Sequence, residues 1–186
     1  MKKFRFLQLA LVLLASVSMT TSVVSASASF PKKGTLGNAG KASIPRKFQG
    51  VWYGKYGKIV LNKSIYQSFP YNKKSKPETS FLLKMKKLPS DFHNPSKKHL
   101  KLARNWIRSY YDSQLNAVNF LGWYQISGFG ETYYYRTVTI KKRKLHVLLE
   151  TPGGDPYAKV YYNVYFRTPG DAKKYQNISV KGMQRP

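Results

Sequence analysis

Residue types that could catalyse a reaction are few in this chain of 186 residues, which has seven carboxylates, three histidines and no cysteine. Glu131 and Glu150 flank expected strands and could form the carboxylate pair of a glycoside hydrolase. In a chain with so many lysines, carboxylates at strand ends are more simply explained as charge partners. The sequence therefore predicts no catalytic residues and a protein that is not an enzyme.

Metal and cofactor sites are not expected either. His93, His99 and His146 do not have the spacing of metal ligands, and no cysteine can complement them. The chain contains no phosphate-binding loop, no dinucleotide fingerprint and no nucleophile elbow. We expect neither a cofactor nor a metal.

Tyrosines and basic residues offer another chemistry, the binding of a polyanion, because cations neutralise phosphates while tyrosine rings stack and donate hydrogen bonds. The run 158–167 alternates in polarity, so one face of a strand would be apolar and the other tyrosine-rich and cationic. A basic connection precedes it at 141–144. The alternative is that tyrosine only shields a sheet. The candidate polyanion-binding residues are Lys141, Lys142, Arg143, Lys144, Lys159, Tyr161, Tyr165 and Arg167.

The elements that would position these residues are mainly strands. Apolar and polar residues alternate in short segments separated by Gly, Pro, Asn and Asp, the clearest being 51–56, 58–61, 65–69, 81–86, 120–126, 132–140, 145–149 and 157–168. Over 96–113 the apolar period changes to three or four residues, which predicts an amphipathic helix. The expected fold is mainly β: a single antiparallel β-barrel or sandwich of about 6–8 strands with one amphipathic helix at about 96–113.

The opening Phe48-Gln49-Gly50-Val51-Trp52-Tyr53 resembles the G-x-W pattern that begins the first strand of lipocalins. The resemblance implies a barrel in which Trp52 packs against a late arginine, here Arg167, and a small apolar ligand inside. The chain has no good T-D-Y signature, and its expected helix lies in mid-chain, whereas a lipocalin helix follows the barrel. The whole layout is similar to small, basic, tyrosine-rich secreted proteins of lactobacilli, a resemblance that implies compartment and fold but no activity.

The first 28 residues have the anatomy of a secretory signal peptide: Lys2, Lys3 and Arg5, an apolar run from Phe6 to Ala15, and an A-x-A site at Ala26–Ala28. We expect 1–28 to be a signal peptide, 29–43 a flexible leader, and 44–186 a single mainly-β domain. The apolar run is too short to cross a bilayer, and no second apolar run approaches that length, so no transmembrane segment is expected after processing. The expected location is extracellular, with retention at the cell wall.

The charge of the chain indicates its partner. The formal net charge is +26, and removal of the three basic residues of the signal peptide would leave +23. Soluble domains are typically designed with a net charge of magnitude about 2–8, so we expect this charge to be used. Export, many lysines and no cysteine favour a Gram-positive envelope, where teichoic acids or similar anionic polymers and anionic surfaces would bind it. No specific nucleic-acid partner is expected.

Two other functions remain open. One is a lipocalin-like barrel that binds a small apolar ligand. The other, a cationic factor acting on membranes, is disfavoured because the expected helix has no long apolar face that could embed in a bilayer interface.

Overall fold

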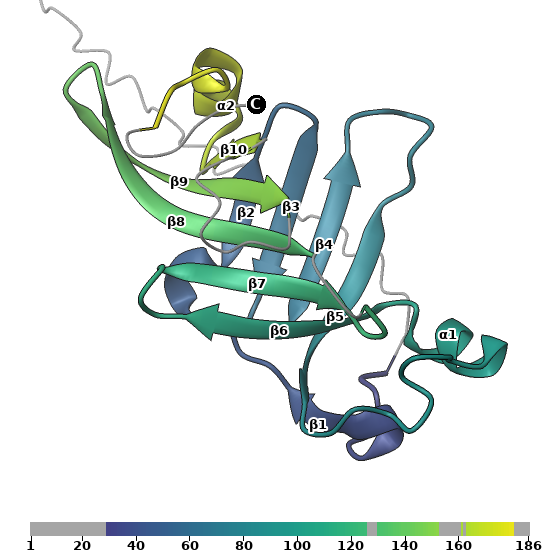
Figure 1. Cartoon of the computed structure of the whole chain (residues 1–186). Coiled ribbons are helices and arrows are strands. Elements are labelled where there is room, and N and C mark those ends of the chain that lie inside the picture. Colours follow the sequence, from purple (N-terminus) through teal and green to yellow (C-terminus); the bar gives the residue numbers. More distant parts are fainter. Residues whose placement is uncertain (1–28, 126–129, 153–160, 162, 181–186) are drawn as a thin grey trace, which may run out of the picture.

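The computed structural model describes residues 29–125, 130–152, 161 and 163–180, and in this part of the chain ten strands form one sheet accompanied by two short α-helices (Figure 1). The strands are β1 (Asn38–Lys41), β2 (Gly50–Tyr53), β3 (Gly57–Asn62), β4 (Ile65–Pro70), β5 (Glu78–Met85), β6 (Trp106–Asp112), β7 (Ala117–Gly122), β8 (Glu131–Ile140), β9 (Arg143–Pro152) and β10 (Asn163–Phe166). The helices are α1 (Lys97–Ala103) and α2 (Pro169–Tyr175), and two 3-10 turns are η1 (Thr35–Gly37) and η2 (Arg46–Phe48).

Nine of the strands close into a barrel. Their order is β5-β4-β3-β2-β10-β9-β8-β7-β6, and β5 pairs with β6 to complete the ring. This closing pair is parallel, whereas the other pairs are antiparallel, and β1 adds to the free part of β5 outside the ring. In Figure 1 the group β2–β5 crosses the group β6–β9 at a steep angle, as in orthogonally packed barrels. The mainly-β barrel is confirmed, with more strands than the sequence predicts and one parallel pair.

Side chains that alternate along the strands fill the barrel, as strand periodicity requires. The interior cluster consists of Phe48, Trp52, Ile59, Leu61, Tyr66, Leu82, Val118, Phe120, Tyr133, Leu148 and Tyr165 with smaller neighbours. Phe48 comes from η2 and is completely buried, so this turn closes one end of the barrel.

Two further apolar clusters lie outside the barrel wall. One joins the outer face of β9 and β10 to α2, through Val147, Leu149, Val164, Phe166 and Tyr175. The other joins β5 and β6 to the end of α1, through Phe81, Leu83, Ala103, Trp106 and Trp123. Strands β9 and β10 are consequently covered on both faces.

The helix expected at 96–113 is wrong over its second half. Helix α1 ends at Ala103, and Trp106–Asp112 forms β6, paired with β7 and β5. The apolar spacing that resembles a helix arises because Ile107 faces the barrel, while Trp106 packs outside it against Trp123, with ring centroids 5.3 Å apart. Tertiary pairing thus overrides the local period.

Two short elements, α2 and β1, were not predicted from the sequence pattern. Helix α2 follows β10 and begins with a side-chain N-cap, in which Thr168 Oγ1 accepts from the Asp171 backbone amide and donates to the Asp171 carboxylate. Within the range 29–43, expected as a leader, the structure has η1 and β1, and β1 pairs with β5. Gly37 makes this possible: its φ is +78°, and a Cβ there would lie 1.9 Å from the carbonyl oxygen of Lys87.

Candidate functional site

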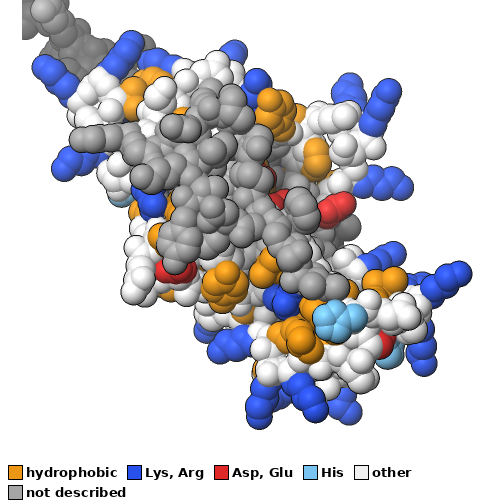
Figure 2. All heavy atoms as spheres, viewed as in Figure 1, with side chains coloured by type: hydrophobic (Ala, Val, Ile, Leu, Met, Phe, Trp, Pro, Cys, Tyr) orange, Lys and Arg blue, Asp and Glu red, His pale blue; other side chains and the backbone are white. Residues whose placement is uncertain are grey.

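Almost none of the positive charge is neutralised within the part of the chain that the structure describes. Arg143 and Asp171 (Nη1–Oδ1, 3.4 Å) are the one Lys/Arg–carboxylate pair there within 4 Å. Asp91 is instead bonded to His99 (2.7 Å), and Asp112 caps backbone amides of the next turn. Lys and Arg side chains project all round the outline in Figure 2, with few acidic side chains visible between them. This surface therefore relies on external anions for compensation.

The tip of the β8–β9 hairpin holds four of the predicted polyanion-binding residues. Ile140 pairs with Arg143, so Lys141 and Lys142 form a two-residue turn, with φ values of +48° and +67°. Such type I′ turns favour Asn and Gly, because other residues lose about 1–2 kcal/mol in the left-handed region. Lys141, Lys142, Arg143 and Lys144 are all exposed. The chain tolerates backbone strain here while presenting cations at the tip.

Helix α2 adds charge beside this tip. Arg143 reaches Asp171 in the first turn of α2, and the last turn carries Lys173 and Lys174, both exposed. We name the set 141–144, 173 and 174 the basic tip. Six cations and one acid therefore gather at this end of the molecule, which makes it attractive to a polyanion.

The remaining predicted residues do not join that surface. Tyr161 is completely buried and donates to the Ile178 carbonyl (2.7 Å), and Tyr165 is 8% exposed inside the barrel. Arg167 donates to the carbonyls of Gln49 (2.7 Å) and Lys47 (2.8 Å), so its role is structural. Lys159 lies outside the described residues. Tyr161 and Tyr165 therefore do not lie on an exposed face, because the barrel interior encloses Tyr165 and the cluster around α2 encloses Tyr161.

A polar network runs through the barrel interior. The Tyr133 hydroxyl donates to Glu131 (2.9 Å) and lies 3.3 Å from the Tyr66 hydroxyl. Tyr133 has no exposed surface, and desolvation is the main reason that the pKa of its hydroxyl is raised. Burial and the nearby charge of Glu150 raise the pKa of Glu131 as well, against the lowering effect of its tyrosine hydrogen bonds.

Glu150 lies in the same network. It accepts hydrogen bonds from Tyr165 (2.9 Å) and from the side-chain amide of Asn163 (2.7 Å), and it pairs directly with Tyr133 across β8 and β9. Glu131 is two residues from Tyr133 on the same strand face, so the two carboxylates are diagonal neighbours. Tyrosine hydroxyls inside the barrel are therefore their partners, in place of the lysines that the sequence suggested.

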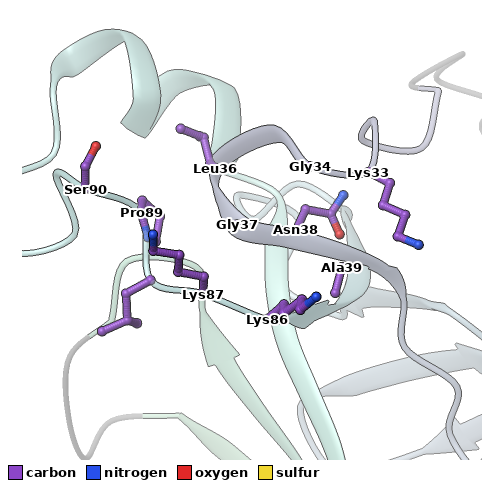
Figure 3. A pocket seen from close by; sticks show the side chains of 11 residues that line it. Lys33, Gly34, Leu36, Gly37, Asn38, Ala39, Lys86, Lys87, Pro89 and Ser90 are labelled. Atoms are coloured by element: carbon purple, nitrogen blue, oxygen red, sulfur yellow. The ribbon is translucent and has the colours of Figure 1, made fainter.

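A cationic cleft lies at the other end of the molecule, between η1–β1 and the connection after β5. Its volume is about 550 Å³. Figure 3 shows Lys33 and Lys86 toward one end of the cleft and Lys87 beside Pro89 toward the other. No acidic residue is among the described residues that line it: Lys33, Gly34, Leu36, Gly37, Asn38, Ala39, Lys86, Lys87, Leu88, Pro89 and Ser90. Sequence reasoning missed this cleft, because its lysines come from separate segments that only the β1–β5 pairing brings together.

Comparisons of the chain with protein-family models, with curated proteins and with solved structures found no match. Among the described residues, no helix is both long and apolar enough to span a membrane. No group of three or more His, Cys, Asp or Glu side chains in that same part of the chain could hold a metal ion.

Proposed function

We propose that the protein is exported and held at the cell envelope by electrostatic binding to anionic polymers such as teichoic acids. The observation that carries this proposal is the nearly complete lack of ion pairs around a chain of net charge +26, with Arg143–Asp171 the one such pair of Lys/Arg with a carboxylate in the described residues. Self-repulsion of this size destabilises a compact protein. An external polyanion removes that repulsion and gains entropy by releasing its own counterions.

The distribution of the cations fits a long polymer better than a small anion. The basic tip and the cationic cleft lie at opposite ends of the molecule, as the positions of the β8–β9 hairpin and β1 show in Figure 1. A chain of phosphodiesters can contact both ends at once, and two linked contacts bind more tightly than either alone. Attachment by charge needs no preformed binding pocket.

The second candidate function is a lipocalin-like barrel for a small apolar ligand. The contact that the resemblance implies is present, because Arg167 stacks on Trp52 at 3.5 Å from the ring centre. The interior, however, is occupied by rings: Tyr133 lies 5.5 Å from Phe120 and 6.1 Å from Tyr165, centre to centre. Attachment to polyanions is therefore the function that we favour.

Lipid-free cell walls provide the test. We expect the purified protein to bind them and to be released by NaCl, with the logarithm of the binding constant falling linearly with the logarithm of salt concentration. Walls stripped of their anionic polymers by mild acid are the matched control and should retain far less protein. Equal binding to stripped walls, or binding that 1 M NaCl leaves unchanged, would contradict the proposal.

A further inference from the structure

A second kind of surface covers the segment that follows β5. We name residues 86–104 the basic lobe, because they contain six Lys or Arg and one acid, Asp91. Three leucines of this lobe are exposed: Leu88 by 49%, Leu100 by 46% and Leu102 by 48%. They are half of the six exposed large hydrophobic residues in the described part of the chain. Cations and exposed leucines are therefore concentrated on one lobe.

The way α1 is attached explains why the leucines face solvent. Ala103 is the one buried residue of α1, and it packs with Trp106 and Trp123. The rest of the helix stands away from the barrel, as its position in Figure 1 shows. Leu100 and Leu102 remain about half exposed. The lobe is thus a projection from the barrel with three leucines exposed to solvent.

The segment that carries Leu88 is tied to the first turn of α1. Leu88 is three residues from Asp91, and the Asp91 carboxylate binds the His99 ring and the Ser96 amide at the start of α1. Three residues of extended chain span at most about 11 Å. Leu88 also lines the cationic cleft. In Figure 2 the lobe at the lower right shows hydrophobic side chains ringed by lysines and arginines.

We propose that the basic lobe docks onto an anionic lipid membrane, with exposed leucines of the lobe entering the interface and the surrounding cations contacting headgroup phosphates. This goes beyond attachment to anionic polymers, and either property can hold without the other. A soluble polyanion would neutralise the lysines but offers no apolar phase for the leucines. A bilayer surface offers both, and polybasic segments bind it through the same phosphates.

A second copy of the chain is a poorer occupant, because two lobes of this charge would repel each other. The neighbouring cleft strengthens the assignment to lipid. Lys33, Lys86 and Lys87 surround a hollow large enough for a phosphate group, and Leu88 lies on its lining. A headgroup in the cleft would leave its acyl chains beside an exposed leucine. The cleft and the leucines therefore point to one ligand chemistry.

The test uses vesicles of equal parts phosphatidylglycerol and phosphatidylcholine, with pure phosphatidylcholine as the uncharged reference. We expect the full chain to co-sediment with the anionic vesicles alone. The triple variant Leu88→Ser, Leu100→Ser, Leu102→Ser should bind them at least tenfold more weakly while binding lipid-free walls as before, because its charge is unchanged. Tyr56→Ser with Tyr71→Ser removes two exposed rings elsewhere and serves as the matched control, with less than a twofold effect.

A direct readout of insertion is the variant Leu100→Trp, whose added ring is exposed in water. Its added fluorescence should shift to the blue on anionic vesicles and be quenched by bromine-labelled acyl chains. Undiminished vesicle binding by the triple variant, or co-sedimentation without a shift at position 100, would overturn the proposal and leave polymer attachment standing. Failure of the full chain to bind anionic vesicles would overturn it equally, whereas failure on lipid-free walls would count against the polymer alone.

Discussion

The guanidinium of Arg167 lies 3.5 Å from the ring centre of Trp52. Arg167 follows directly after β10, and Trp52 belongs to β2. The same guanidinium donates to the carbonyls of Gln49 and Lys47, and the Trp52 indole donates to the Phe48 carbonyl (2.7 Å). Strands β2 and β10 are joined by a register of one residue pair, Phe166 with Tyr53. The arginine therefore links β10 to β2, where the barrel has only this one residue pair, and to the turn η2 that closes the end of the barrel.

Replacement of this arginine should weaken the whole barrel. Arg167→Met removes two charge-assisted hydrogen bonds and the contact with the indole, so we expect the free energy of unfolding to fall by about 2–3 kcal/mol. Arg167→Lys should recover less than half, because an ammonium cannot bridge the two carbonyls. Urea unfolding followed by tryptophan fluorescence measures the change. Arg104→Met, at an exposed position, should stay within about 0.5 kcal/mol of the parent.

The glycine of the G-x-W opening is explained by the same contact. Gly50 has a φ of +110°, and a Cβ there would lie 2.6 Å from Arg167 Nη1. We expect Gly50→Ala to lower stability by about 1–3 kcal/mol through backbone strain and the displaced guanidinium. The loss should be smaller in an Arg167→Met background, and a double-mutant cycle measures that coupling. Gly170→Ala has no atom within 4 Å of the added Cβ and is the control. Equal losses in both backgrounds would show that Gly50 and Arg167 act independently.

Strands that have one face inside the barrel could be predicted from the sequence. Along β8, Tyr133 and Tyr135 face the barrel while Thr132 and Tyr134 do not, and this simple alternation predicts the strand. Strand β6 could not be found in this way, because its two faces enter different apolar clusters and mimic a helical period. Its identity depends on pairing with β5 and β7, which no local pattern contains.

Only part of the candidate site could be predicted from the sequence, for a related reason. Local charge is enough to predict the exposed Lys141–Lys144 tip. The exposure of Tyr161 and Tyr165 depends on what covers each face of their segment, and α2 and the barrel interior cover both. The cationic cleft needs Lys33 and Lys86 to meet across the β1–β5 pairing. Alternation identifies two faces of a strand but not which of them meets solvent.

The buried carboxyl of Glu131 should make stability depend on pH. Burial and the charge of Glu150 raise its folded-state pKa above the unfolded value of about 4.3, so the folded protein binds more protons between the two values. The free energy of unfolding should therefore fall as pH rises from about 4.3 through the folded pKa, and then level off. Glu131→Gln should remove this fall and raise stability at pH 7. Glu78→Gln removes an exposed carboxylate whose charge contributes least to the raised pKa of Glu131, so it should change the profile far less. Urea unfolding between pH 4 and 8 measures both.

Replacing the two lysines of the hairpin turn should make the protein more stable but weaken its binding to polyanions. Lys141→Asn with Lys142→Gly supplies the residues that a type I′ turn prefers, so we expect the free energy of unfolding to rise by about 1 kcal/mol. The same change removes two cations from the basic tip. If each contacts a phosphate of the polymer, the slope of log binding constant against log salt should decrease in magnitude by roughly 1–2 on polyphosphate. Lys73→Asn with Lys74→Gly makes the same change of charge in the loop before β5 and is the matched control. An equal loss of binding in both variants would mean that the tip contributes net charge alone, whereas a larger loss at the tip would show that its position matters.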